Sequence, residues 1–104
     1  DNTIQPFTSI GNNVILWSGN HIGHHSVILD HVFITSHVVV SGHCVIESNC
    51  FLGVNSTIRD GSRLKQGTLL AMVSSLVTSE TKEWSVYVGK PAKLKDNNPS
   101  YEIL

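Results

Sequence analysis

The sequence lacks the features that mark secreted, membrane-bound or nucleic-acid-binding proteins. Its 104 residues include only two cysteines, which is too few for a disulfide framework. A formal net charge of −1 with 14% charged residues gives no basis for binding nucleic acid or an anionic membrane surface. No apolar run approaches the roughly 18 residues of a membrane helix, and no charged and then apolar leader marks a signal peptide. We therefore expect a cytoplasmic protein, long enough for one domain.

What the sequence has instead is a strict six-residue repeat. Every sixth residue is aliphatic, in the column Ile4, Ile10, Leu16, Ile22, Ile28, Ile34, Val40, Ile46, Leu52, Ile58, Leu64, Leu70 and Leu76. A period of six excludes an α-helical stripe, whose period is 3.6. The fifth place of each hexad is small or β-branched except at Asn20, and the fourth is rich in Gly, Asn and His, which tolerate a left-handed backbone. Each hexad therefore predicts a short strand followed by a turn at its third and fourth places.

Such short strands, with corners at fixed spacing, are expected to stack as coils. Three hexads per coil would give a triangular prism with the aliphatic column along its axis. The pattern resembles the hexapeptide-repeat family, which implies an all-β, left-handed parallel β-helix. We predict this solenoid over residues 1–77, with twelve hexads in four coils, and a short C-terminal extension over 78–104 that holds a loop, a closing strand and a tail.

The sixth place of each hexad is expected to point outward from a wall of the prism. With three hexads per coil, one wall carries an apolar stripe of Ile15, Phe33, Phe51 and Leu69. An exposed stripe of this kind usually marks an interface. The homotrimer typical of the resembled family is consistent with it. The alternative is that a C-terminal segment covers the stripe.

Three segments narrow the resemblance. Asn20 to Ser26, Phe51 to Ser56 and Gly89 to Lys93 together resemble the sialic acid O-acetyltransferase group, which includes N-acetyltransferases of nucleotide-linked amino sugars. The resemblance implies transfer of an acetyl group from acetyl-CoA to an amino or hydroxyl group of a sugar, taken to be nucleotide-linked. The relatives' N-terminal Rossmann-like domain is not in this sequence, so we expect an incomplete or differently built acceptor site.

The same resemblance implies that His24 is the general base, because relatives carry a histidine at the third place of this hexad. They often have an acidic residue next, which orients the imidazole, whereas this chain has His25. The orienting group is then left open between Asp30, in the same column on the next corner, and a backbone carbonyl. His24, Asp30 and His25 are the catalytic candidates, and His21 and Asn20 are the substrate-binding candidates.

For acetyl-CoA, the resemblance points to a groove beside the later coils and the C-terminal strand. Gly42, Gly53 and Ala71 are small enough to let the pantetheine arm lie against the backbone. Lys90 and Lys93 are expected to meet the phosphates of CoA.

Two other functions fit the repeat: a non-catalytic β-helix assembly module, or a zinc hydratase of the γ-carbonic anhydrase type. Zinc needs imidazoles that converge on one point. His25 and His43 are 18 residues apart and should stack on one corner, where a neighbouring subunit would have to add a third ligand. The carbonic anhydrase pattern has a distant third histidine that this sequence lacks, so we expect no metal. Cys44 and Cys50 fall in the inward column and are predicted to fill the core.

Overall fold

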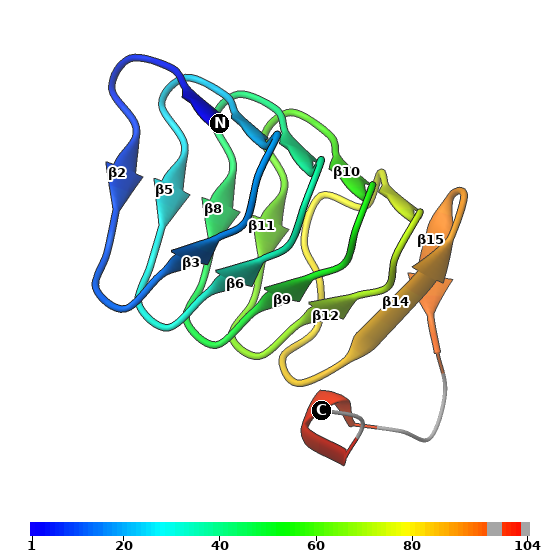
Figure 1. The fold of residues 1–104 in the computed structure, drawn as a ribbon. Coiled ribbons are helices and arrows are strands. Elements are labelled where there is room, and N and C mark those ends of the chain that lie inside the picture. Colours follow the sequence, from blue (N-terminus) through cyan, green and yellow to red (C-terminus); the bar gives the residue numbers. More distant parts are fainter. Residues whose placement is uncertain (96–98, 103–104) are drawn as a thin grey trace.

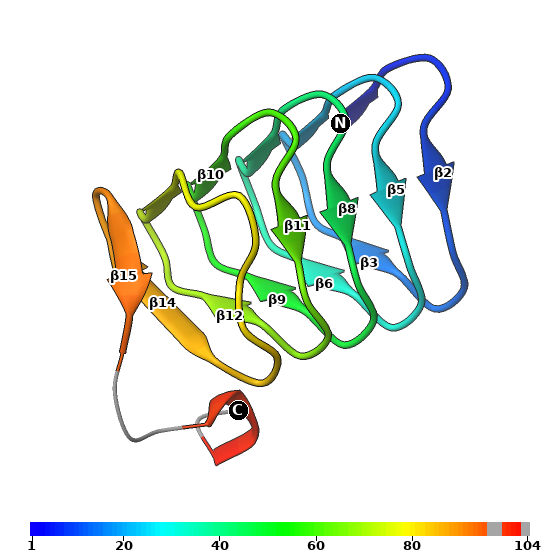
Figure 2. The same cartoon turned by 180° about the vertical axis from the view of Figure 1, so that it is seen from behind.

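The computed structural model describes residues 1–95 and 99–102, which form a prism with three walls (Figures 1 and 2). Sheet A contains β1 (Thr3–Ile4), β4 (His21–Ile22), β7 (Val39–Val40), β10 (Thr57–Ile58) and β13 (Ser75–Leu76). Sheet B contains β2 (Ser9–Ile10), β5 (Val27–Ile28), β8 (Val45–Ile46) and β11 (Arg63–Leu64). Sheet C contains β3 (Ile15–Leu16), β6 (Phe33–Ile34), β9 (Phe51–Leu52), β12 (Leu69–Leu70), β14 (Val86–Gly89) and β15 (Ala92–Leu94).

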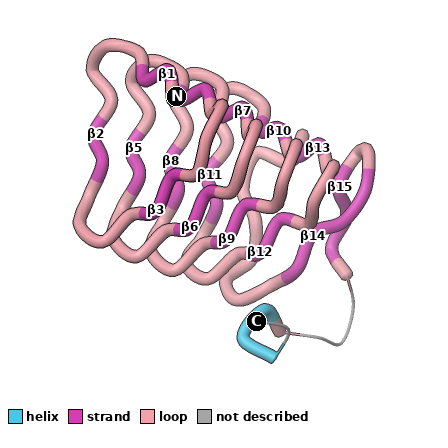
Figure 3. Tube along the Cα trace, viewed as in Figure 1, coloured by secondary structure: helices cyan, strands magenta, loops and turns pink. Residues whose placement is uncertain are grey.

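The register of these sheets confirms the predicted parallel β-helix. Each two-residue strand spans the boundary between two hexads. It consists of the outward sixth-place residue of one hexad and the inward aliphatic residue that begins the next (Figure 3). Strands pair in parallel with those of the next coil, as in His21 with Val39 and Val27 with Val45. Residues 18 apart in the sequence therefore lie one above another, and each coil holds three hexads.

Turns join the walls at the predicted places. All twelve fourth-place residues have positive φ, between 54° and 74°, in the series Phe7, Asn13, Gly19, His25, His31, His37, His43, Asn49, Asn55, Gly61, Gly67 and Val73. The abundance of Gly, Asn and His in this column is therefore explained by backbone conformation. Phe7 and Val73 are the exceptions in residue type, and Val73 is the more strained because it is β-branched.

The aliphatic column forms the core. From Ile22 to Leu76 its side chains are at most 1% exposed, whereas Ile4 and Ile10 at the N-terminal end of the prism are 46% and 36% exposed. The fifth-place column lies beside it, and the predicted core positions of Cys44 and Cys50 are confirmed, since both are buried free thiols. Burial raises the pKa of the Cys50 thiol to about 12 and also raises the pKa of Cys44.

The end of the chain continues the winding instead of leaving it at once. Glu80, in the segment predicted to be a loop, forms a parallel bridge with Arg63. β14 then extends sheet C by pairing in parallel with β12, and β15 turns back antiparallel to β14.

Beyond β15, the 3₁₀ turn η1 (Ser100–Glu102) follows, and Ser100 donates its backbone N–H to the carbonyl oxygen of Trp84 at 2.9 Å. Part of the predicted C-terminal tail, residues 96–98 and 103–104, lies outside the described residues. Within the part of the chain that is described, no helix has the length and apolar character needed to cross a bilayer.

The apolar stripe lies on sheet C, where Ile15 pairs with Phe33, Phe33 with Phe51 and Phe51 with Leu69. It is not uniformly exposed: Ile15 is 46% exposed and Leu69 only 7%. The aromatic members pack along the wall, with the rings of Phe33 and Phe51 5.3 Å apart. The stripe is thus open at the N-terminal end of sheet C and buried at the other end.

Candidate active site

His24 lies at the AB corner, the turns that join sheet A to sheet B (residues 5–8, 23–26, 41–44 and 59–62). Both neighbouring coils hold its backbone: its N–H donates to Oε1 of Gln5 at 3.0 Å, and its carbonyl oxygen accepts from the N–H of His43 at 2.9 Å. The imidazole lies over Gly42, where an added Cβ atom would be only 2.9 Å from Nε2 of His24. The absent side chain of Gly42 therefore makes the space that the ring occupies.

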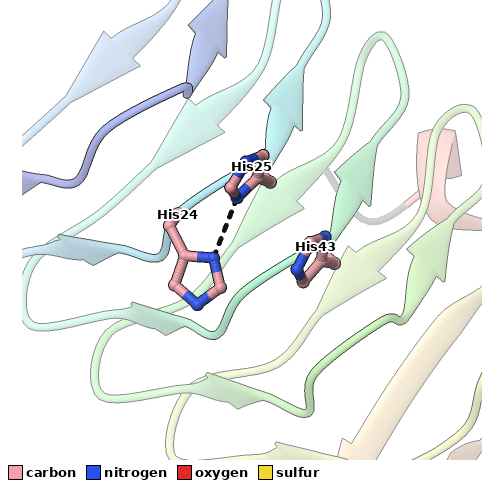
Figure 4. A group of neighbouring side chains, drawn as sticks. All are labelled: His24, His25 and His43. Atoms are coloured by element: carbon pink, nitrogen blue, oxygen red, sulfur yellow. Dashed lines mark hydrogen bonds between the residues drawn. The ribbon is translucent and has the colours of Figure 1, made fainter.

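Three imidazoles meet at this corner (Figure 4). His25 and His43 stack face to face, with ring centroids 4.9 Å apart and an interplanar angle of 7°, which confirms the predicted stack. The ring of His24 stands perpendicular to both, with centroids 5.3 Å from His25 and 5.0 Å from His43. One nitrogen from each ring lies within 4.8 Å of the other two, and all three residues are exposed.

The fold explains why these rings converge. His25 and His43 occupy the fourth place of hexads one coil apart, with φ of 59° and 58°, so their side chains leave the corner in the same direction. Phe7 has the same place in the preceding coil, and its ring stacks on His25 at 4.9 Å. His24, at the third place, leaves the same corner at a different angle and so meets the stack from the side.

A hydrogen bond joins His24 to His25, with Nδ1 of one ring 3.1 Å from Nδ1 of the other. Such a bond needs an N–H on one ring and a lone pair on the other. When Nδ1 of His24 donates, its Nε2 carries the lone pair. His25, the next residue in the sequence, is therefore the side chain that hydrogen-bonds the ring of His24.

The structure gives Asp30 a different partner. This residue follows β5 at the corner between sheets B and C, and its Oδ1 accepts the backbone N–H of Asn12 at 2.7 Å. The carboxylate thus supports the turn of the preceding coil at another corner. The predicted orienting role of Asp30 finds no support in this position, because corners that are adjacent in sequence are separated by a wall of the prism.

A groove of about 370 Å³ lies at the CA corner, the turns that join sheet C to sheet A (residues 17–20, 35–38, 53–56 and 71–74). It is lined by Trp17, Thr35, Phe51, Gly53, Val54, Leu69, Ala71 and Met72. Two of the three small residues predicted to contact CoA, Gly53 and Ala71, are in it. Gly42 is not, since it lies beneath His24 at the AB corner.

The coils approach closely beside this groove. A Cβ atom at Gly53 would lie 2.5 Å from the backbone nitrogen of Met72. No side chain fits there without moving the next coil, because the clash is with backbone atoms.

The remaining predicted residues are spread over the molecule. Lys90 and Lys93 are exposed, at the turn between β14 and β15 and on β15 itself. His21 is half-buried on the outer face of β4, on the wall that separates the groove from His24. These three residues thus do not join the histidine cluster.

Asn20 is only 2% exposed. Its Oδ1 accepts the backbone N–H of Val38 at 2.8 Å, and its own N–H donates to Oδ1 of Asn2 at 3.0 Å. A fifth-place side chain points inward, so Asn20 bonds the next coil at the corner, and the predicted contact with substrate is corrected to a structural role. The signal that could have shown this is Asn2, which precedes Asn20 by one coil.

Sequence reasoning also missed parts of both corners. The sequence predicted that His43 lies above His25, but it did not predict that His24 of the same chain contacts them. It did not find Trp17 and Met72 in the groove. The 18-residue spacing and the adjacency of His24 to His25 were the available signals for the cluster, whereas the groove depends on side-chain orientation.

Part of the AB corner lies within a stretch of the chain that matches a known family. Residues 7–42 match the family described as Bacterial transferase hexapeptide (six repeats). This matched stretch, about a third of the chain, is similar to that family. The matched stretch includes His24, His25 and Gly42 and ends one residue before His43, whereas the hexads themselves continue to Leu76. No curated protein sequence matches the chain significantly.

Solved structures share this architecture. Serine acetyltransferase from Neisseria gonorrhoeae superposes with a TM-score of 0.83 at 21% identity, over 97% of this chain and 45% of that chain. PerB from Caulobacter crescentus, in complex with CoA and GDP-perosamine, gives a TM-score of 0.71 at 19% identity, over 90% and 54%. A mutant of AntD, an N-acyltransferase from Bacillus cereus, in complex with dTDP and coenzyme A, gives 0.69 at 18% identity, over 98% and 80%.

These identities are low enough that the likenesses show the fold alone. The chain spans about half the length of the serine acetyltransferase and of PerB, at 45% and 54%. The features of this chain that bear on function are therefore the repeat and the two corners.

Proposed function

We propose that the protein is an acyltransferase that moves an acetyl group from acetyl-CoA to an amino or hydroxyl group of a nucleotide-linked sugar, with His24 as general base. The observation that carries the proposal is the imidazole of His24, held over Gly42 with its Nδ1 3.1 Å from Nδ1 of His25, inside a transferase hexapeptide repeat. The structures of PerB and AntD, which hold CoA together with a nucleotide sugar or a nucleotide, support this substrate class.

In this reaction Nε2 of His24 takes a proton from the acceptor group as that group attacks the carbonyl carbon of the thioester. The new C–N or C–O bond forms, the C–S bond breaks, and CoA leaves as a thiolate. The proton on His24 then passes to the thiolate, which restores the neutral imidazole. The side chain is suited to this role because it is exposed and its backbone is fixed by hydrogen bonds from two coils.

His25 is proposed to orient the base. As acceptor of the Nδ1–H of His24, it keeps the lone pair on Nε2, which is the role that an acidic residue has in relatives. A neutral imidazole stabilises the protonated form of His24 less than a carboxylate does, so the base is expected to depend on the His25 tautomer. The stacking of His25 between Phe7 and His43 holds its ring in place.

The groove at the CA corner is the proposed site of the pantetheine arm. Its lining is apolar, and Gly53 and Ala71 leave the backbone accessible. Lys90 and Lys93 remain candidates for the CoA phosphates. Because the groove and His24 lie at opposite edges of sheet A, a neighbouring copy that places its AB corner against this CA corner would complete the site. This supports the homotrimer, with the open part of the apolar stripe on sheet C as part of the contact.

The test is an acetyl-transfer assay that follows free CoA thiol, with nucleotide-linked amino sugars as acceptors and metal removed with a chelator. His24→Ala should lower kcat by roughly 10²- to 10⁴-fold, the range for loss of a general base. The KM for acetyl-CoA should change little, because the groove is untouched.

His31→Ala is the control for loss of an exposed histidine at a different corner. His31 is at the fourth place of its hexad, with φ of 60°, and lies outside the histidine cluster. Wild-type turnover by a folded His24→Ala protein would exclude His24 as the base. Absence of acetyl-CoA binding to the wild type, measured by calorimetry, would favour the non-catalytic assembly module.

A further inference from the structure

We propose that His24, His25 and His43 form a binding site for a divalent transition-metal ion of the Zn²⁺, Ni²⁺ or Cu²⁺ class, built within one chain. The three residues each present a ring nitrogen, and these atoms lie within 4.8 Å of one another. Sequence reasoning required a second subunit for the third ligand, whereas the structure supplies all three from one corner of one prism (Figure 4).

The distances are close to those of a bound site. At a metal–nitrogen distance of about 2.0–2.1 Å and tetrahedral angles, ligand nitrogens are about 3.3 Å apart. Nδ1 of His24 and Nδ1 of His25 already stand 3.1 Å apart. Closing the widest separation from 4.8 Å to this value needs a movement of about 1.5 Å, which exposed side chains can make by rotating about their own bonds.

The backbone limits the cost of this rearrangement. His43 donates its N–H to the carbonyl oxygen of His24 at 2.9 Å, and His25 donates its N–H to that of Pro6 at 3.2 Å. The stacked rings of His25 and His43 only have to tilt toward each other. The fourth position faces solvent and would be filled by water, as in sites with three protein ligands.

The ligand set selects the class of ion. Neutral imidazole suits Zn²⁺, Ni²⁺ and Cu²⁺, and affinity rises along the divalent first-row series from Mn²⁺ to Cu²⁺. Mg²⁺ and Ca²⁺ prefer oxygen ligands and should not bind. We expect one ion per chain, with Cu²⁺ bound more tightly than Zn²⁺ and Mn²⁺ bound weakly.

Bound metal would act on the proposed reaction, a consequence that rests on His24 being the base. A neutral imidazole has one lone pair. Coordination through Nδ1 uses that pair and leaves a proton on Nε2, so His24 could no longer accept a proton from the acceptor. The ion would therefore inhibit acyl transfer.

The test uses the full protein, free of any polyhistidine tag, without acetyl-CoA. ZnCl₂ and NiCl₂ are titrated separately by isothermal calorimetry, with MgCl₂ as the negative control. The expected result is one site per chain for both transition metals and no heat of binding with MgCl₂. Imidazole NMR signals of three histidines, and not of the other three, should shift with Zn²⁺.

Variants identify the ligands. His25→Asn and His43→Asn keep a residue type that accepts positive φ, and each should weaken Zn²⁺ binding by at least about tenfold. His31→Asn and His37→Asn make the same change at other corners and should leave the affinity unchanged. Circular dichroism verifies that each variant is folded.

Equal loss of affinity in the His31→Asn control, or no stoichiometric Zn²⁺ binding by the wild type, would overturn the proposal. Binding that is retained in His43→Asn but lost in His25→Asn would also overturn it, because the ion would then not bridge two coils. Since no acyl donor is present, these outcomes are independent of whether His24 acts as a base. The inhibitory consequence is measured afterwards, as loss of turnover on adding ZnCl₂ that excess chelator reverses.

Discussion

The AB and CA corners have the same backbone conformation but different side chains. Both turn through a fourth-place residue with positive φ, such as His43 at the AB corner and Asn55 at the CA corner. At the AB corner, Gly42 leaves a space that an imidazole fills from the adjacent coil, and polar rings gather there. At the CA corner, Trp17 and Met72 bound an apolar groove that stays open. The repeat thus fixes the backbone position of each corner residue. The identity of the third-place residue and its neighbours decides whether the corner holds a cluster of side chains or an open groove.

Filling the groove at the CA corner should have a larger effect than the changes described below, and it should affect that corner alone. Ala71→Phe puts a large side chain into the groove and should weaken acetyl-CoA binding about 100-fold, or about 2.7 kcal/mol. The affinity of the histidine cluster for Zn²⁺ should stay unchanged. Calorimetry with each ligand tests both statements. Ser48→Phe, which adds the same side chain at the third corner, is the control. Unchanged affinity for acetyl-CoA in Ala71→Phe would remove the groove as the donor site.

A smaller change displaces His24 without removing it. In Gly42→Ala the new Cβ would lie 2.9 Å from Nε2 of His24, and the ring can move away because it is exposed. We expect a fall in kcat of about tenfold, since a misplacement of about 1 Å at a catalytic group costs one to two orders of magnitude. Thermal unfolding should be nearly unchanged. Ser48→Ala serves as the control, and a wild-type kcat in Gly42→Ala would show that the position of the ring does not matter.

One turn of the CA corner has a strained backbone. Val73 has φ of 58°, at a place where the preceding coil has Asn55. Val73→Asn should stabilise the protein by about 1 kcal/mol, because asparagine accepts this conformation more readily. That corresponds to a rise in Tm of about 5 °C for a domain of this size. The reciprocal change, Asn55→Val, should lower Tm by a similar amount, and opposite signs from these would contradict the strain.

The smallest expected effect comes from the ion pair between Glu47 and Arg63, which lies outside the AB and CA corners and serves as a reference for them. Glu47 bonds Arg63 at 2.6 Å. Burial alone would raise the pKa of this carboxyl, but the hydrogen bonds from Arg63 and the Gln66 N–H lower it overall. A lowered pKa in the folded state stabilises the protein above the pKa of the unfolded chain and loses that contribution as pH falls through the folded value.

Because the side chain of Arg63 is 46% exposed, the ion pair is expected to contribute less than about 1 kcal/mol. Arg63→Gln should therefore lower the free energy of unfolding slightly at neutral pH and have no effect in acid, as measured by urea denaturation at both pH values. The metal affinity of the AB corner and the acetyl-CoA affinity of the CA corner, measured at neutral pH, should not change. A larger loss in acid than at neutral pH would contradict the sign.

Much of the fold could be read from the six-residue period. That period placed Ile28 and Leu64 in the core and the turns at their positions, and the assumption of three hexads per coil placed His25 above His43. Asp30 was placed correctly in its column and named as a candidate to orient His24, whereas its carboxylate accepts the backbone N–H of Asn12. The period gives the position of a carboxylate and says nothing about which of several nearby backbone N–H groups it accepts.

The sequence by itself determined the stacking of short strands into coils, because a strict repeat of inward aliphatic residues and left-handed turn positions buries its apolar side along one axis. Only the tertiary structure decided that His24 turns over Gly42 to meet two stacked rings, that Asn20 is sealed inside its corner, and that a groove opens beside Ala71. These outcomes depend on side-chain rotamers, which are set by the space that residues 18 positions away leave free.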